Sequence, residues 1–394
     1  MLTSIAAILL SGLFGGWIFK KLRLPGLLGM ILAGIIISPY SLDLIGESMR
    51  NVSADIRQIA LVIILTRAGL SLNVSDLKKT GRPALLLSFV PACLEIAGTI
   101  LLAPILFDIS FLDAAVIGSV IAAVSPAVIV PRMIKLIDEG YGKEKSIPQM
   151  ILAGASVDDV FVIVVFTAMT SLASTGTVSA VRFVQIPLSI LLGILLGVCA
   201  GLILSFFFSK TRLDDIVKVL VMLSVSFLML EIQDILADIV SVSGLLGIMS
   251  MGVVIRQKQG VSAGSAAAVY NRLWTGAEIF LFVLVGAAID LRYVRSAGTA
   301  AVVLVIGALM FRMAGVALSL FKTNLTGKEK LFCMAAYTPK ATVQAAIGAV
   351  PLSMGLLCGN LVLTIAVLSI LITAPFGAIC IDKLYKNTLE KKTE

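Results

Sequence analysis

The chain has 394 residues, of which 59% are apolar and only 14% are charged, with a formal net charge of +8 and no histidine. A soluble globular domain carries about a quarter charged residues, whereas the apolar runs here reach about 20 residues, enough to cross a bilayer. The composition excludes a soluble enzyme and predicts an all-α polytopic membrane protein. The basic residues form short clusters between apolar runs, so the positive charge does not indicate nucleic-acid binding.

Glycines, prolines and charged clusters divide the chain into thirteen candidate membrane spans. From the N-terminus they cover approximately residues 2–19, 25–39, 53–72, 83–107, 111–133, 148–172, 183–208, 216–232, 234–255, 274–291, 296–321, 331–354 and 360–381. Lys and Arg gather in alternate loops, for example at Lys20 and Lys21 and again at Lys322 and Lys328. Because basic residues accumulate in short cytoplasmic loops, this alternation predicts an N-terminus outside and a C-terminus in the cytoplasm.

Two sequence patterns recur in the same order in the two halves of the chain. Residues 26–29 (GLLG) in the second span return as residues 244–247 in the ninth, and residues 122–127 (AAVSPA) resemble residues 335–340 (AAYTPK). The shifts, 218 and 213 residues, are nearly equal. Spans 2–6 and 9–13 then form two five-helix units, and the odd number of crossings between them inverts the second unit. Inverted repeats are typical of secondary transporters.

Five ionisable residues fall near the middle of predicted spans. They are Glu95 in span 4, Asp158 and Asp159 in span 6, Arg312 in span 11 and Lys340 in span 12. A charge at the bilayer centre costs at least about 3 kcal/mol, so such residues normally face a cavity, pair with one another or carry function. We interpret Glu95 and Arg312 mainly as a buried charge pair, although a functional role is nearly as well supported. Lys340 is expected to balance the negative ends of broken helices and to contact Asp158.

Each of spans 5 and 12 has a proline at its centre, Pro126 and Pro339. Proline removes a backbone N–H and disfavours helical backbone at the preceding residue, here Ser125 and Thr338. Non-helical backbone at this depth is tolerated where it lines a buried cavity, and unwound carbonyls such as that of Val124 can coordinate ions. The pattern therefore favours two broken helices that cross, while a simple kink in each helix is the alternative.

The adjacent carboxylates of Asp158 and Asp159 are the most informative feature of span 6. Neighbouring helical residues are about 100° apart, so both side chains can border one cavity. Oxygen ligands, including the hydroxyl of Ser156 close by, are those that hard cations prefer, and a carboxylate pair can hold a proton instead. The sequence therefore predicts a site for a hard cation or a proton, and the alternative is a helix-end or salt-bridged structural pair.

At these motifs the chain resembles the monovalent cation:proton antiporter superfamily, in particular its proton antiporter-2 branch and the NHA-type sodium/proton antiporters. The residues that carry the resemblance are 123–131 (AVSPAVIVP), the Asp158-Asp159 pair and 338–346 (TPKATVQAA). The resemblance implies that Asp159 is the principal ion and proton site, assisted by Asp158 and by the hydroxyls of Ser125 and Ser156. It implies a transporter with no cofactor beyond its transported ions.

The same resemblance implies the domain organisation of a homodimer in the lipid bilayer, expected in a bacterial inner membrane. A core translocates the ions and moves as an elevator against a dimerisation scaffold. The expected parts are a scaffold at 1–72 and 216–291, a core at 83–172 and 296–382, a linker helix at 183–208 and a cytoplasmic tail at 383–394.

The chain departs from the electrogenic bacterial relatives at Arg312, where they place a lysine. Arginine does not lose its proton in proteins. The five central groups carry a net charge of −1 when all are ionised, which one Na⁺, one Li⁺ or one H⁺ would neutralise. We therefore expect one-for-one exchange, with K⁺/H⁺ antiport as the alternative. An intramembrane aspartyl protease is disfavoured because its aspartates lie on opposing helices, and a channel because inverted repeats favour a carrier.

Overall fold

The structure is a computed structural model that describes residues 1–22, 24–71, 74–174, 180–211, 213–236, 240, 242–289 and 291–391. Every regular element within these ranges is a helix, apart from an isolated antiparallel bridge between Tyr141 and Lys391. Of the predicted segments, residues 23, 72, 237–239, 241, 290 and 392–394 lie outside the described residues. The all-helical membrane architecture predicted from composition is confirmed.

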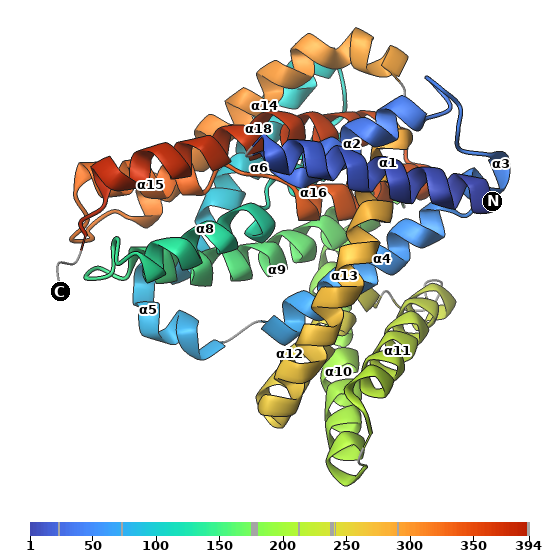
Figure 1. Cartoon of the computed structure of the whole chain (residues 1–394), viewed down its shortest axis with the longest axis horizontal. Helices are drawn as coiled ribbons and strands as arrows, with labels where there is room; N and C mark the ends of the chain where they lie inside the picture. The colour runs from blue at the N-terminus through green and yellow to red at the C-terminus, as the bar shows by residue number, and fades with distance from the viewer. Residues whose placement is uncertain are drawn as a thin grey trace. The chain divides into compact units, whose positions relative to one another are not determined.

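The helices follow one another with short connections (Figure 1). Their bounds are α1 Leu2–Lys21, α2 Gly26–Ile37, α3 Glu47–Asn51, α4 Ser53–Ser71, α5 Val74–Leu87, α6 Val90–Phe107, α7 Phe111–Ile121, α8 Pro126–Asp138, α9 Ile147–Ser174, α10 Ala180–Lys210, α11 Asp215–Leu236, α12 Gly244–Gln259, α13 Val261–Ala287, α14 Leu291–Ser319, α15 Gly327–Ala336, α16 Thr342–Ile347, α17 Val350–Ser353 and α18 Gly359–Thr388.

Eight stretches of helix in the described part of the chain are long and apolar enough to cross a bilayer. They are Leu2–Lys21, Gly81–Phe107, Phe111–Asp138, Ile147–Ser174, Leu188–Lys210, Ala263–Ala287, Gly298–Ser319 and Gly359–Thr388. Shorter apolar helices lie at Gly26–Ile37 and Thr342–Ser353. The chain is therefore an integral membrane protein.

Two helix starts, those of α12 and α13, differ most from the ones expected from the sequence. The span expected at 234–255 begins later, because α11 continues to Leu236 and Ser243 caps the start of α12, its hydroxyl accepting from the N–H of Leu246 at 3.4 Å. The span expected to begin at residue 274 begins at Val261 instead. Small, helix-compatible residues precede the apolar run there, so hydropathy alone places the start of α13 too late.

The chain folds into two compact units, each assembled from segments that are distant in the sequence. Unit 1 comprises Met1–Ser53, Val74–Ala173 and Phe282–Glu394, and unit 2 comprises Ala54–Asn73 and Ser174–Leu281. In unit 2, α10 packs along α12 with the two backbones in direct contact. A Cβ at Gly197 would collide with the carbonyl oxygen of Gly247, so only glycine permits this approach.

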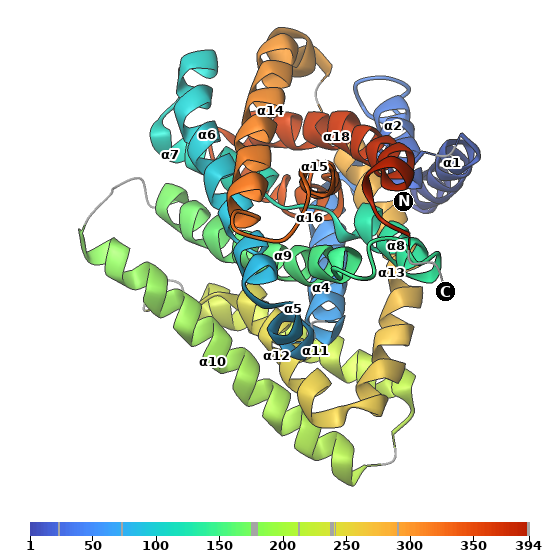
Figure 2. The ribbon, with the colours of Figure 1, turned by 90° about the vertical axis from the view of Figure 1, so that its left-hand side faces the viewer.

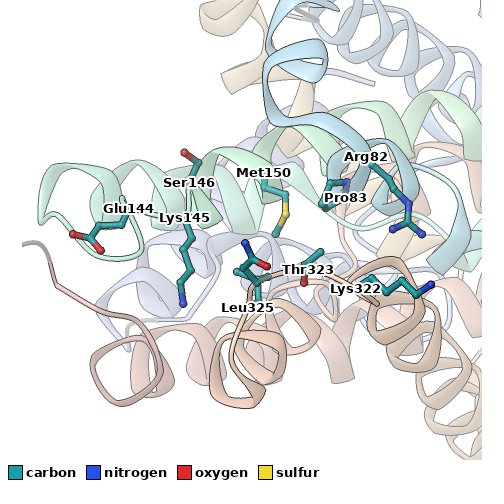
Figure 3. Close-up of a pocket in the computed structure, with 10 residues that line it drawn as sticks. Arg82, Pro83, Glu144, Lys145, Ser146, Met150, Lys322, Thr323 and Leu325 are labelled. Carbon is teal, nitrogen blue, oxygen red and sulfur yellow. The ribbon is translucent and has the colours of Figure 1, made fainter.

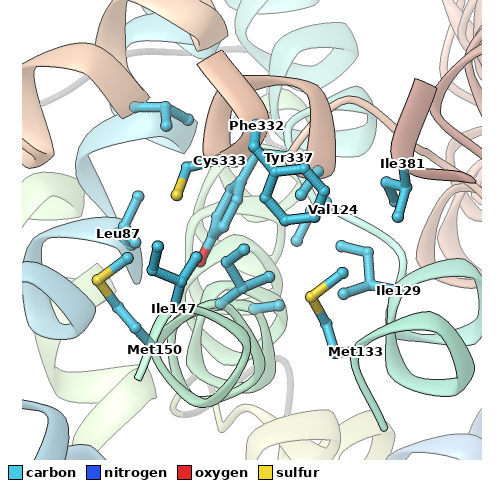
Figure 4. Close-up of a cluster of buried hydrophobic side chains, with 14 of the residues drawn as sticks. Leu87, Val124, Ile129, Met133, Ile147, Met150, Phe332, Cys333, Tyr337 and Ile381 are labelled. Carbon is cyan, nitrogen blue, oxygen red and sulfur yellow. The ribbon is translucent and has the colours of Figure 1, made fainter. Parts of the chain in front are cut away.

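Within unit 1, α6 and α14 pack side by side along much of their length (Figure 2). These two helices carry Glu95 and Arg312. A cluster of buried apolar side chains joins α14 to α5, α8, α9, α15 and α18, with the rings of Phe332 and Tyr337 at its middle and Met133 and Met150 around them (Figure 4). The cluster fixes the helices that surround the buried charges.

Candidate ion-binding site

Two interrupted helices meet in unit 1. The first is broken at 122–125 between α7 and α8, and the second at 337–341 between α15 and α16. Pro126 occupies the first turn of α8, where its missing N–H costs no hydrogen bond, while Ser125 before it is extended. The N–H of Ser125 donates to the carbonyl oxygen of Pro339 at 2.8 Å, and the Oγ atoms of Ser125 and Thr342 are 3.4 Å apart. The two breaks are therefore joined directly.

Arg312 is the most connected side chain at this junction, and it is fully buried. Its Nε donates to the carbonyl oxygen of Tyr337 at 2.8 Å, its Nη1 to Oε2 of Glu95 at 3.0 Å, and its Nη2 to Oδ2 of Asp158 at 2.9 Å. Nη1 also hydrogen-bonds the carbonyl oxygen of Ala122. One guanidinium thus joins α14 to α6, to α9 and to both helix breaks, using the planar fork of donors that lysine lacks.

Lys340 lies in the second break and is also fully buried. Its Nζ is 2.6 Å from Oε1 of Glu95 and hydrogen-bonds the carbonyl oxygen of Ile121, the last residue of α7. A cation at this position is favourable because the C-terminal end of a helix carries partial negative charge. The ion pair of Lys340 is with Glu95 and not with Asp158, the partner expected from the sequence.

Gln344 completes the junction, although the sequence analysis did not select it as a site residue. Its Nε2 donates to the carbonyl oxygen of Ala123 at 2.7 Å, and its Oε1 accepts from the N–H of Ala341 at 2.8 Å. The backbone N–H of Lys340 is satisfied in a similar way by Oγ1 of Thr373 at 3.0 Å. The sequence feature that could have identified Gln344 is its amide side chain inside a predicted span. A buried amide at that depth needs hydrogen-bond partners, and the backbone of a broken helix supplies them.

The two aspartates of α9 differ in their environment. Asp158 is fully buried, and its Oδ2 accepts from Arg312 and from the backbone N–H of Val124 at 2.8 Å. Asp159 is 8% exposed. Within the described residues Oδ1 of each aspartate is buried and lacks a hydrogen-bond partner. A buried carboxylate oxygen without a partner is costly, so both atoms are suited to accept a proton or a cation.

The structure does not bring every predicted site residue to this point. Ser156 is exposed, and its Oγ donates to the carbonyl oxygen of Leu152 at 2.8 Å, one helical turn earlier. Val124 contacts Asp158 through its N–H. Thr338 donates its hydroxyl to the carbonyl oxygen of Ala335 at 2.8 Å and so caps the end of α15.

With all five groups ionised, the buried cluster carries three negative and two positive charges. Glu95 is shared by both cations and Asp158 is paired with Arg312, while Asp159 makes no ion pair in the described part of the chain. The uncompensated charge of −1 is therefore assigned to Asp158 and Asp159, whose Oδ1 atoms lack hydrogen-bond partners among the described residues. One monovalent cation or one proton would neutralise it.

Comparison with known proteins places this arrangement in a family. Residues 6–384 match the family described as "Sodium/hydrogen exchanger, transmembrane". The human sodium/hydrogen exchanger 9B2 is 33% identical over 387 residues, which cover 93% of this chain and 70% of the relative. The human sodium/hydrogen exchanger 9B1 is 30% identical over 408 residues, which cover 97% of this chain and 77% of the relative.

The fold is shared with a solved transporter structure. The sodium proton antiporter MjNhaP1 from Methanocaldococcus jannaschii matches with a TM-score of 0.80 at 21% sequence identity, over 97% of each chain. The family match extends over nearly the whole chain and includes both helix breaks and all five buried charges. This chain belongs to the sodium/hydrogen exchanger family and is a membrane antiporter.

Proposed function

We propose that this chain exchanges Na⁺ or Li⁺ for H⁺, with the two ions competing for the carboxylates of Asp158 and Asp159. The observation that carries the proposal is the pair of buried carboxylate oxygens that find no partner among the described residues, beside a cluster with one uncompensated negative charge. The curated relatives are named sodium/hydrogen exchangers, which supports Na⁺ and H⁺ as the transported ions.

The two aspartates have different roles in this proposal. Asp158 is held by Arg312 and by the N–H of Val124, so it orients the site and contributes its remaining oxygen. Asp159, without an ion-pair partner among the described residues, is the carboxylate that takes up and releases the ion or proton. Ser125, whose Oγ lies in the helix junction, supplies a further oxygen. Carboxylate and hydroxyl oxygens are suitable ligands for a hard monovalent cation.

Exchange is proposed to be one for one. Arg312 stays protonated and is fixed by four hydrogen bonds, so it does not supply a second transported proton. A cluster with one excess negative charge is neutralised by one ion of either kind. Because an uncompensated charge is costly to move through a low-dielectric region, only the neutral cluster crosses readily, and this couples the two ions.

For the whole molecule we propose thirteen spans, with spans 2–6 and 9–13 as inverted repeats, an outside N-terminus and a cytoplasmic C-terminus, in a bacterial inner membrane. The two helix breaks, one in each half of the chain, support the repeat. We further propose an NHA-type antiporter of the proton antiporter-2 branch, acting as a homodimer. Its core, 83–172 with 296–382, moves as an elevator against a scaffold formed by 1–72 and 216–291.

Antiport in everted membrane vesicles tests the proposed ion site. Na⁺, Li⁺ and K⁺ are offered separately to vesicles with the wild-type chain, the Asp159→Asn variant or an Asp108→Asn control. Asp108 is exposed and left-handed at φ 51°, a conformation that asparagine tolerates. We expect exchange of Na⁺ or Li⁺ by the wild type and the control, and loss of exchange in Asp159→Asn. Exchange of K⁺ alone would support the K⁺/H⁺ alternative, and undiminished exchange by Asp159→Asn would refute the site.

A further inference from the structure

A pocket with basic residues lies in unit 1, outside the buried ion cluster (Figure 3). It has a volume of about 510 Å³ and lies among the start of the Gly81–Phe107 span, the connection from α8 to α9 and the connection from α14 to α15. Arg82, Lys145 and Lys322 supply its positive charges, one from each segment. None of the five residues of the buried cluster lines it.

The two ends of the pocket differ in charge balance. At one end, Nζ of Lys145 lies 2.9 Å and 3.0 Å from the two carboxylate oxygens of Glu329, and Glu144 lines the same end. At the other end, Arg82 and Lys322 form no ion pair or side-chain hydrogen bond with any residue that the structure describes. Their side chains extend toward the same side of the pocket (Figure 3). Among the described residues, two positive charges are therefore unbalanced at this end.

We propose that this pocket binds a phosphate-bearing anion, with Arg82 and Lys322 contacting the phosphate oxygens. Arginine offers a planar fork of donors that matches phosphate geometry, and lysine adds a compact charge. Asn324, an amide that also lines the pocket, can donate a further hydrogen bond. A lipid headgroup and a free phosphate present the same chemistry, and the apolar side chains of Pro83 and Met150 accommodate the uncharged part of either ligand.

The backbone holds the two cationic residues in place. Gly81, directly before Arg82, has φ 72° and ψ −158°, which turns the chain at the start of the span and which only glycine adopts readily. Lys322 itself has a left-handed φ of 58° just after α14. Arg82 follows the kink within α5 and Lys322 follows the end of α14, and both lie in unit 1, so the ligand would link segments from both halves of the chain.

The test measures thermal unfolding of the purified full chain in neutral detergent at constant Na⁺ and ionic strength. One arm replaces chloride by inorganic phosphate, and the other replaces added phosphatidylcholine by phosphatidylglycerol. The pocket variant is Arg82→Gln with Lys322→Gln. The control is Lys143→Gln with Lys328→Gln, which removes two exposed charges from the neighbouring segments outside the pocket. All four side chains are exposed, so we expect equal stability without ligand.

We expect the wild type and the control to be stabilised in at least one arm, with a roughly tenfold weaker apparent affinity in the pocket variant. Stabilisation by inorganic phosphate would show that a soluble phosphate is sufficient to bind the pocket. Stabilisation by phosphatidylglycerol alone identifies a lipid-borne phosphate. Absence of a shift in both arms, or an equal shift in the pocket variant and the wild type, would overturn the proposal. Because the measurement requires no transport, its outcome is independent of the ion exchange proposed above.

Discussion

Nη2 of Arg312 lies 2.9 Å from Oδ2 of Asp158, and both side chains are fully buried. The same guanidinium reaches Glu95 and the carbonyl oxygens at both helix breaks. Asp158 is thereby fixed and partly neutralised, while the adjacent Asp159 makes no ion pair with any residue that the structure describes. The difference between two neighbouring carboxylates is the basis of the proposed exchange.

Replacing Arg312 should be among the most destabilising changes in the chain. Arg312→Gln leaves Asp158 without its ion-pair partner and Glu95 with Lys340 alone, and breaking a buried pair in this way costs about 3–5 kcal/mol. Arg312→Lys keeps the charge but cannot make four contacts at once. Its free energy of unfolding should therefore lie between those of the wild type and Arg312→Gln. Thermal unfolding in detergent measures both.

The matched control is Arg132→Gln, which removes a partly exposed ion pair with Asp382 and should cost at most about 1 kcal/mol. If Arg312→Gln unfolded at the same temperature as this control, the structural role assigned to the guanidinium would be wrong.

Tyr337→Phe should leave stability unchanged or raise it. The hydroxyl of Tyr337 is buried and has no hydrogen-bond partner within the described residues, at a cost of about 1–3 kcal/mol for a buried polar group of this kind. Phenylalanine keeps the ring in the apolar cluster and removes the hydroxyl. A decrease in the unfolding temperature would show that the hydroxyl does find a partner in the folded protein.

Gln344→Leu should lower the free energy of unfolding by about 1–3 kcal/mol. Leucine has a similar volume but leaves the carbonyl oxygen of Ala123 and the N–H of Ala341 without their side-chain partners. Thermal unfolding reports the loss, with Gln344→Glu as a second variant that preserves the acceptor for Ala341 alone. Wild-type stability in both variants would contradict a role for Gln344 in holding the two breaks together.

Glu329→Gln should lower the free energy of unfolding at neutral pH and leave it almost unchanged at acidic pH. Burial alone would raise the pKa of Glu329, but hydrogen bonds from Nζ of Lys145 and the N–H of Thr326 outweigh it, and the pKa lies below its usual value. The stabilisation is present above the ordinary glutamate pKa and is lost as the pH falls through the depressed one. The unfolding temperatures of the variant and the wild type should therefore converge as the pH falls. A difference that stays constant with pH would contradict a stabilising role for the ionised carboxylate of Glu329.

Much of the fold is predictable from the sequence because the apolar runs and the paired prolines act locally. Pro126 disfavours helix at Ser125 whatever surrounds it, and the structure has extended backbone there. The late start expected for α13 has the opposite cause: the residues from Val261 onward form a helix without being strongly apolar, so hydropathy does not mark them.

The contacts within the site are less predictable, because they depend on which side chains the packing brings together. The sequence associates Glu95 with Arg312 by their places in spans 4 and 11, but the bond from Arg312 to Asp158 requires α9 beside α14. Ser156 lies two residues before Asp158, yet its hydroxyl satisfies a backbone carbonyl of its own helix. The spacing of residues in the sequence predicts neither the contact between Arg312 and Asp158 nor the hydrogen bond that Ser156 makes within its own helix.

The most direct test of the central claim measures Na⁺-driven proton flux in proteoliposomes at several external pH values, for the wild type and Asp159→Asn. If Na⁺ and H⁺ compete for one site, the KM for Na⁺ should rise about tenfold per unit of acidification wherever the site is protonated, with an unchanged maximal rate, and Asp159→Asn should show no flux. A pH-independent KM with a falling maximal rate, or wild-type flux by Asp159→Asn, would contradict the account.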